Sequence, residues 1–461
     1  MVFHTWPFVL FFTAFYAVYI ALKNTRFSLP WLLLASYVFY GWWNPYYLVL
    51  IFYATLFDYA AVYGMSRSPR KTFWLGCSIA NNVLLLGFFK YYNFLTENIN
   101  WIFREIHLPY HLPALDIWLP IGISFYIFKS LSYVIDCYRE EVEREPSFVR
   151  HALYVSFFPQ VAEGPIERAK NLLMQFRRIP AITKQDIGDG ISLFVVGMFK
   201  KIALANYLAL YVDRVYATPD QYQSPALILA TLAFGWQLYF DFSGYTDMAR
   251  GIARLMGFQV MLNFNHPYLA AGFTDFWARW HISLSNWLRD YIFTPLIAVG
   301  KTRHPRYLIY RNVLITFLVS GLWHGAAWTF IIWGILHAAG ILLTMELDRR
   351  RWYKKQCPRW IKQAGTYLLI NFTWIFFRAE NMNDAGVIVS RILTSGIADP
   401  MFPLLAAVLV LAAVTYQALY ESRYRRLLET AGARYALVFG MILYLSLFPG
   451  AGESSFVYFQ F

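Results

Sequence analysis

Long apolar runs separated by short polar segments follow one another along the whole chain. Most runs approach the roughly 20 residues that an α-helix needs to cross a bilayer. Since only 15% of the residues are charged, against about 25% in soluble proteins, the composition favours a membrane protein. The pattern predicts an all-α, polytopic protein with about 11–12 transmembrane helices. The predicted crossings are 6–22, 30–44, 46–64, 73–94, 118–137, 190–212, 225–245, 311–324, 326–345, 363–378, 403–420 and 434–449.

Basic residues gather in the polar segments after the first, third, ninth and eleventh crossings, around positions 23–26, 67–71, 349–355 and 423–426. Positive charge marks cytoplasmic loops, and alternating crossings allow all four segments to lie there. This arrangement places both chain ends on the outer side. It also explains the net charge of +13 better than a nucleic-acid partner does. The first run lacks the flanks of a cleaved signal, so we interpret it as a membrane anchor.

Two regions, 150–187 and 246–310, mix charged and aromatic residues and do not fit simple crossings. We expect half-inserted or amphipathic helices on the cytoplasmic side. Irregular backbone is tolerated at membrane depth only where it is buried in protein or lines a water-filled cavity. We therefore predict that these two regions form the walls of a central chamber. The whole chain is interpreted as one membrane-embedded domain with peripheral helices, a catalytic core and C-terminal helices at about 1–137, 150–380 and 381–461.

His324 is the first candidate for chemistry. It lies in a stretch from Asn312 to Met345 that contains no Lys, Arg, Asp or Glu. An ionisable side chain at membrane depth is costly and indicates function. Histidine is also the side chain best suited to moving a proton near neutral pH. We therefore predict that His324 is catalytic and that its neighbour Trp323 contacts substrate.

The second candidate is His281, in the aromatic segment 273–291. At 100° per residue, Trp277 and His281 share one helix face, which would point into the protein. A structural histidine bonded to a backbone carbonyl is the alternative. A catalytic role for His281, with substrate contacts from Trp277, Arg279 and Ser285, is the other interpretation, and the residues of this segment leave both open.

Asp241 is the third candidate, near Asp247 and Arg250 at the cytoplasmic end of an apolar segment. Asp247 and Arg250 are neighbours on a helix at i,i+3. Two interpretations remain open, an internal ion pair that orders the chamber wall and a contact between Asp241 and substrate.

The chain shows no metal-ligand spacing among its histidines, and its three cysteines are scattered. The sequence therefore predicts neither a metal site nor a disulfide framework. The other histidines, His337 among them, lie in loops or on apolar faces without a partner that the sequence identifies.

Nine stretches together carry a resemblance that covers nearly the whole chain. The chain resembles the membrane-bound O-acyltransferase (MBOAT) family and, within it, the bacterial alginate O-acetyltransferase group. The stretches are 86–94, 119–126, 132–139, 156–160, 241–251, 277–291, 322–326, 373–380 and 456–461.

The resemblance aligns His324 with the family's near-invariant catalytic histidine and His281 with a second conserved polar position. It therefore implies a catalytic role for both histidines, and we predict one for His281 as well as for His324. Two departures bear on the acceptor rather than on the reaction class. Residues 297–303 replace a turn like Gly-Gly-Asn-Arg, and Glu163 stands where related proteins commonly have a small residue.

The resemblance implies an O-acyltransferase of the bacterial cytoplasmic (inner) membrane. It would move an acetyl group from a cytoplasmic thioester such as acetyl-CoA, with no bound cofactor, to an extracytoplasmic polysaccharide such as alginate. Basic residues such as Arg279, Arg289 and Lys301 could attract the donor or act only as topology signals. His324 could act as a general base or as a covalent acyl carrier.

An exported partner is also implied, an SGNH esterase-like acyltransferase with a Ser/His/Asp site. The aromatic tail 454–461 could bind this partner or pack on the last helix. Another acceptor (teichoic acid, peptidoglycan, lipid or peptide) and a transporter without chemistry are the alternatives. The paired broken helices typical of many transporters are not visible in the sequence.

Overall fold

The computed structural model describes residues 1–299, 305–398, 403–422, 424–428 and 430–447, and these residues form only helices and connecting segments. The all-α prediction is therefore confirmed. The chain divides into two compact units, Met1–Phe194 with Met248–Met261 and Val195–Asp247 with Leu262–Phe461. We call them unit 1 and unit 2. The predicted division into peripheral helices, core and C-terminal helices stays a prediction.

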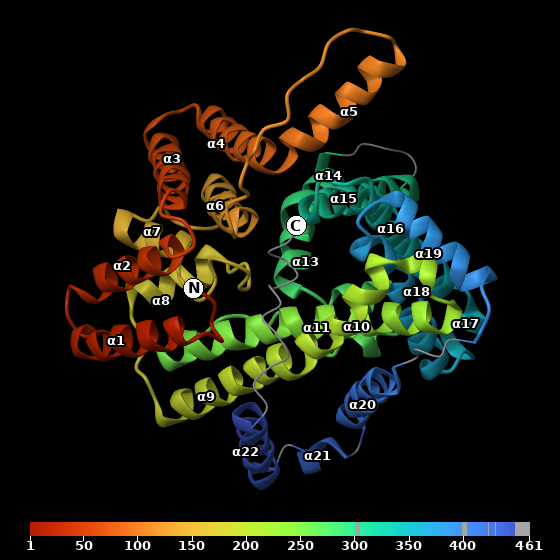
Figure 1. The fold of residues 1–461 in the computed structure, drawn as a ribbon. Coiled ribbons are helices and arrows are strands. Elements are labelled where there is room, and N and C mark those ends of the chain that lie inside the picture. Colours follow the sequence, from red (N-terminus) through yellow and green to blue (C-terminus); the bar gives the residue numbers. More distant parts are fainter. Residues whose placement is uncertain (300–304, 399–402, 423, 429, 448–461) are drawn as a thin grey trace. The chain divides into compact units, whose positions relative to one another are not determined.

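Unit 1 begins with the helices that the first five apolar runs predict (Figure 1). Short helices then occupy the mixed region 150–187, as expected. Its elements are α1 (Trp6–Leu22), α2 (Ser28–Gly41), α3 (Tyr47–Arg67), α4 (Lys71–Leu86), the π-helical η1 (Gly87–Tyr91), α5 (Tyr92–Glu105), α6 (Ile123–Tyr138), α7 (Phe148–Ser156), α8 (Ala169–Arg177), most of α9 (Lys184–Phe199) and the end of α11 (Ser224–Leu255).

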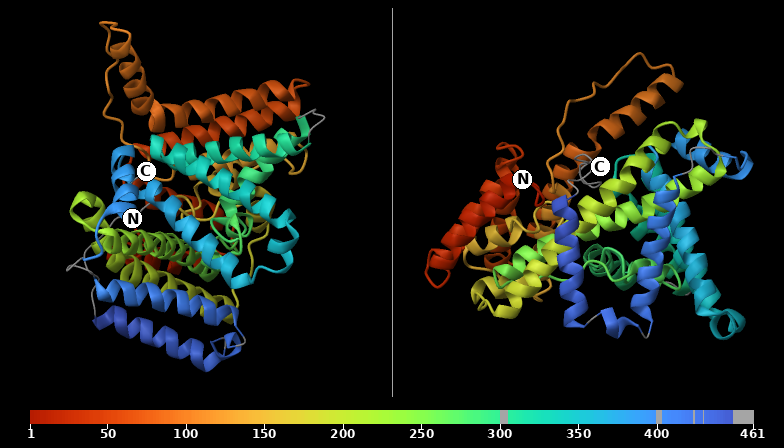
Figure 2. Two further views of the ribbon diagram at one scale, coloured as in Figure 1. Left: turned by 90° about the vertical axis from the view of Figure 1, so that its right-hand side faces the viewer. Right: turned by 60° about the horizontal axis from the view of Figure 1, so that its bottom comes forward.

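Unit 2 contains the end of α9, most of α11 and all later helices. Figure 2 shows α21 joining α20 to α22. The further elements are η2 (Lys200–Ala205), α10 (Asn206–Ala217), η3 (Pro219–Gln221), η4 (Pro267–Leu269), α12 (Phe273–Trp277), α13 (Ile282–Leu288), η5 (Arg289–Phe293), α14 (Thr294–Val299), α15 (Pro305–His324), α16 (Trp328–Arg349), α17 (Arg351–Lys355), α18 (Arg359–Arg378), α19 (Met382–Thr394), α20 (Leu404–Glu421), α21 (Arg425–Leu428) and α22 (Ala431–Leu447).

Five helical segments among the described residues are long and apolar enough to cross a membrane, and shorter apolar helices accompany them. The long segments are Tyr47–Arg67, Lys71–Glu105, Lys184–Ala217, Ser224–Leu255 and Trp328–Arg349. Each predicted crossing overlaps a helix in the part of the chain that the structure describes, although α6 begins only at Ile123 and residues 448–449 lie outside that part. Because a buried α-helix satisfies its own backbone hydrogen bonds, this architecture suits a bilayer, and the prediction of a multi-pass protein is confirmed.

The fourth crossing extends well beyond its predicted end. A continuous helical segment runs from Lys71 through η1 to Glu105, and α5 projects from unit 1 with the following chain folded back beside it (Figure 1). Asn100 holds this return by accepting from Leu112 N and donating to Leu112 O, at 2.8 and 2.9 Å. Hydropathy ends the crossing near residue 94 because α5 is amphipathic, but these hydrogen bonds let the helix continue.

Two predictions for region 246–310 are wrong. Residues 246–255 continue α11 instead of starting a half-inserted segment. Residues 273–291 do not form one helix, because α12 ends at Trp277 and His281 adopts a left-handed conformation with φ 42°. Asn263 stabilises the break, since its carbonyl accepts from Ile282 N at 2.9 Å and its Oδ1 accepts from Ser283 N at 3.1 Å. A tertiary contact thus overrides the local helical periodicity.

Helices α15 and α16 form a close pair that ends in the turn after His324. A Cβ on Gly321 would lie 2.3 Å from the carbonyl oxygen of Phe330, and one on Gly334 would lie 2.4 Å from that of Phe317. Only glycine allows the two backbones to approach this closely. The close approach fixes the end of α15, and therefore His324, against α16.

The turn after α15 allows a test of orientation. We expect Ala327→Cys, at a half-buried position in this turn, to react with a membrane-impermeant maleimide added to spheroplasts. Cys357 follows the basic segment 349–355 and is the matched control, since the charge pattern places it in the cytoplasm. The experiment uses a protein with Cys77 and Cys137 replaced by Ala. Labelling of Cys357 in spheroplasts, with Ala327→Cys reacting only after lysis, would contradict this orientation.

Candidate functional site

His324 is the last residue of α15 and is 3% exposed. Three aromatic rings enclose its imidazole. The ring centroids of Trp323 and Trp333 each lie 4.9 Å from that of His324, and the centroid of Phe377 lies 5.1 Å away. All three present an edge-to-face geometry, which is the favoured arrangement of aromatic pairs. These rings give the imidazole largely apolar surroundings within unit 2.

His281 lies between α12 and α13 and is fully buried. Its ring centroid lies 4.6 Å from that of Phe242 on α11 and 5.8 Å from that of Trp323 on α15. Burial lowers the pKa of the His281 imidazole to about 3, so the ring is neutral at physiological pH. It could therefore orient a substrate through hydrogen bonds, but it cannot attract a phosphate by charge.

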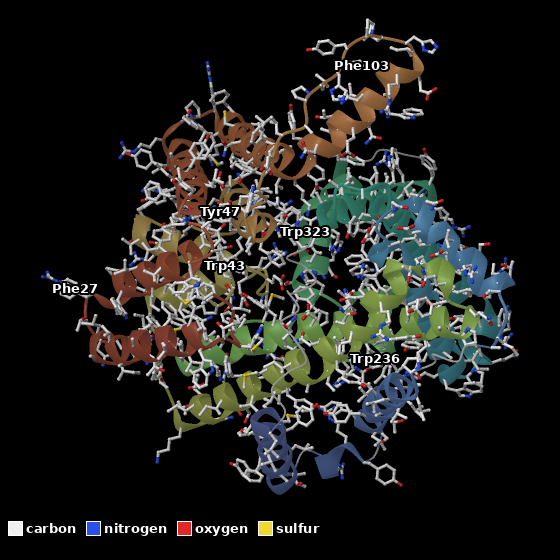
Figure 3. The ribbon with its side chains drawn as sticks, in the orientation of Figure 1. Phe27, Trp43, Tyr47, Phe103, Trp236 and Trp323 are labelled. Atoms are coloured by element: carbon white, nitrogen blue, oxygen red, sulfur yellow. The ribbon has the colours of Figure 1, made fainter. Side chains whose placement is uncertain are left out.

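Trp323 connects the two predicted catalytic histidines, since its indole contacts both imidazole rings. Trp323 itself is buried, as is Trp236 on α11 (Figure 3). The structure thus brings together His281 and His324, which are 43 positions apart in sequence, around one indole. Contact between Trp323 and a substrate stays a prediction.

The predicted substrate-binding residues of the aromatic segment have protein partners. Trp277 donates its indole N–H to His337 Nδ1 at 3.2 Å. Arg279 Nε lies 2.7 Å from Asp275 Oδ1, and Ser285 donates its hydroxyl to the carbonyl of Trp280 at 3.1 Å. Trp277 is therefore a structural side chain in the region that contains the two histidines. Substrate contacts of Arg279 and Ser285 stay predictions, and Lys301 lies outside the described residues.

Asp241 forms an internal ion pair. Its Oδ1 lies 2.6 Å from Lys201 Nζ on η2, and both side chains are buried. Asp247 Oδ2 likewise lies 2.7 Å from Lys200 Nζ, which is also on η2. These contacts favour the interpretation of an ordered wall, with the partner supplied by a second helix. Contact between Asp241 and substrate stays a prediction.

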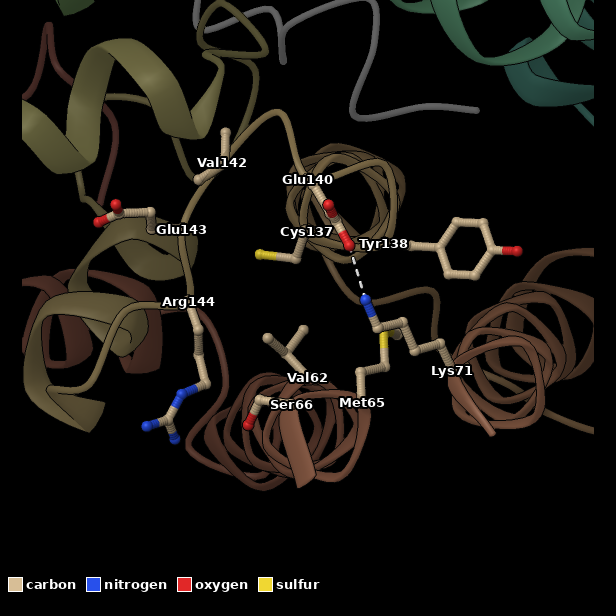
Figure 4. Close-up of a pocket in the computed structure, with 10 residues that line it drawn as sticks. All are labelled: Val62, Met65, Ser66, Lys71, Cys137, Tyr138, Glu140, Val142, Glu143 and Arg144. Carbon is tan, nitrogen blue, oxygen red and sulfur yellow. Dashed lines mark hydrogen bonds and ion pairs between the residues drawn. The ribbon is translucent and has the colours of Figure 1, made fainter. Parts of the chain in front are cut away.

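Two further features of the described residues concern possible ligands. Among them, no group of three or more His, Cys, Asp or Glu side chains could hold a metal ion. A cavity of about 280 Å³ in unit 1 is lined by residues that include Val62, Met65 and Cys137, and an ion pair of 2.6 Å joins Lys71 to Glu140 at its edge (Figure 4). This cavity contains neither of the predicted catalytic histidines.

Comparison with known proteins identifies the family of this chain. The model of the MBOAT, membrane-bound O-acyltransferase, family matches residues 126–383, a range that includes both His281 and His324. The chain belongs to the MBOAT family. It is therefore an O-acyltransferase, an enzyme that transfers an acyl group from a donor to a hydroxyl group of an acceptor.

Three relatives of this MBOAT protein differ in their named acceptors. AlgI of Pseudomonas putida, described as a probable alginate O-acetylase, is 38% identical over 391 residues, which cover 84% of this chain and 79% of AlgI. The peptidoglycan O-acetyltransferase of Helicobacter pylori is 35% identical over 395 residues, covering 79% and 73%. The teichoic acid D-alanyltransferase of Bacillus subtilis is 29% identical over 287 residues, covering 60% and 71%.

Sequence reasoning missed the surroundings of His324 in this MBOAT protein. Trp333 and Phe377 come from α16 and α18, and the sequence does not reveal that they meet. The sequence identified no partner for His337, and the structure shows that it bonds to Trp277 and Thr373. Its position one helical turn after Trp333, in the same uncharged stretch as His324, was the available signal.

Proposed function

We propose that this MBOAT protein transfers an acetyl group from acetyl-CoA on the cytoplasmic side to hydroxyl groups of a polysaccharide outside the cytoplasmic membrane. The observation that carries the proposal is the burial of His324 among Trp323, Trp333 and Phe377, with His281 also in contact with Trp323. An imidazole in such a site can take the proton of an attacking hydroxyl.

The chemistry assigned to His324 is general-base catalysis. His324 accepts the hydroxyl proton while the hydroxyl oxygen attacks the thioester carbon, and the thiolate leaves and takes up that proton. The ester forms as the thioester breaks, so no other reactant is needed. Because the apolar walls exclude water, they protect the thioester from hydrolysis. His281 orients the donor as a neutral hydrogen-bonding group.

An alginate-type polymer is the proposed acceptor. The proposal rests on the printed descriptions of relatives such as AlgI, and peptidoglycan is the second candidate because a relative of similar identity is named for it. We further propose that, in the cell, an exported SGNH esterase-like protein supplies the attacking hydroxyl and passes the acetyl group on to the polymer. The tail 454–461, one possible docking segment, lies outside the described residues.

An assay of purified protein with acyl-CoAs of increasing chain length tests the donor. We expect release of free CoA to be greatest with acetyl-CoA and to increase when a hydroxyl acceptor is added. A uronate oligosaccharide and a peptidoglycan fragment, compared at equal hydroxyl concentration, distinguish the two acceptors. Absence of turnover with every thioester, in a folded protein, would refute the proposal.

A further inference from the structure

His337 on α16 is held by two hydrogen bonds that define its protonation. Trp277 Nε1 lies 3.2 Å from His337 Nδ1, and an indole nitrogen can only donate. Nδ1 is therefore an acceptor, so the proton of the neutral ring sits on Nε2. Thr373 Oγ1 lies 2.9 Å from Nε2, and the Thr373 hydroxyl donates to the carbonyl of Ile370 at 2.7 Å. Thr373 therefore accepts from His337.

This arrangement leaves no place for a second proton on the ring. Protonation of Nδ1 would direct an N–H against the indole N–H of Trp277 and break that bond in a fully buried site. His337 thus acts as a neutral connector. It joins Trp277, the last residue of α12, to Thr373 on α18.

The connector is separated from His324 by a single ring. Trp333 precedes His337 by one helical turn, and their ring centroids lie 4.5 Å apart. The Trp333 indole also contacts His324 and Phe377, with ring centroids 4.9 and 5.5 Å away. Since the Trp333 indole is fully buried, it can move only if the rings around it move.

We propose that His337 is a positioning residue for the reaction, which sets the orientation of the His324 imidazole through Trp333. This proposal rests on the proposed role of His324. Neither His337 nor Thr373 touches the reacting atoms in this account. A misplacement of a catalytic group by about 1 Å can lower a rate by about 100-fold. Loss of the hydrogen bond between His337 and Thr373 should therefore have a measurable effect on the reaction rate.

Thr373→Val is the main test, because it removes the acceptor for His337 and keeps the side-chain shape. Thr366→Val is its matched control, since Thr366 is also buried on α18 and donates to its own helix, at Lys362 O. We expect Thr373→Val to lower kcat about tenfold, with little change in KM for the acyl donor. Thr366→Val should change neither value. His337→Asn, which keeps an acceptor for Trp277, should retain more kcat than His337→Leu.

The pH profile and a folding measurement complete the test. Because the ring does not titrate, the acid limb of kcat should keep its position in His337→Asn. A displaced or missing limb would make His337 a proton carrier and overturn the proposal. The proposal would also be overturned if activity fell only in proportion to the amount of folded protein. A wild-type kcat in folded Thr373→Val would overturn it as well. Activity retained in His324→Ala, measured in parallel, would instead overturn the proposed function.

Discussion

His324→Ala is expected to lower acyl transfer at least about 1,000-fold, because general-base catalysis contributes about 10²–10⁴-fold and the replacement leaves no group at that position that can take the hydroxyl proton. Because the alanine methyl group is much smaller than the imidazole, the replacement also leaves a cavity among Trp323, Trp333 and Phe377. The measurement is transfer from acetyl-CoA by purified protein, at equal concentrations of folded enzyme.

A second variant separates chemistry from folding. His324→Gln fills most of the same space without providing a base, so it should be as inactive as His324→Ala but nearer the wild type in thermal stability. Added imidazole should restore part of the activity of His324→Ala if the residue is a base. An acyl group isolated on His324 of the wild type would indicate the covalent route. Near wild-type transfer by folded His324→Ala would refute the assignment.

Replacement of His281 by Asn should lower kcat/KM for the acyl donor about 10- to 100-fold, equivalent to about 1.4–2.8 kcal/mol. Asn is the informative replacement because it tolerates the left-handed backbone of His281 better than most residues do. The change therefore removes the ring between Phe242 and Trp323 with little backbone strain. Because the pKa of His281 is lowered to about 3, the acid limb of kcat should not move.

His266→Asn is the matched control for His281→Asn. His266 is also left-handed, with φ 45°, but its ring lies against Tyr420 at 4.3 Å rather than against Trp323. We expect His266→Asn to keep donor kinetics close to the wild type. Equal losses in both variants would indicate a backbone effect, and unchanged kinetics in folded His281→Asn would assign His281 a structural role only.

The sequence predicted the helices and the candidate histidines because both depend on local composition. A crossing needs an apolar run of sufficient length, so α1 (Trp6–Leu22) begins and ends at its predicted residues. His324 and His281 were recognisable because each is an ionisable group among apolar or aromatic residues. The resemblance to the MBOAT family was available from the order of residues alone and is confirmed, whereas the roles of the two histidines stay predictions.

Only the tertiary structure revealed which side chains meet. The break at His281 depends on Asn263, and the partner of Asp241 is Lys201 from another helix. Likewise, His337 acquires its role from Trp277 and Thr373, which lie 60 and 36 positions away. Helical periodicity describes the face on which a residue lies but not the surface that this face contacts. Local energies of about 1 kcal/mol per residue are overridden when buried polar groups must find partners across helices.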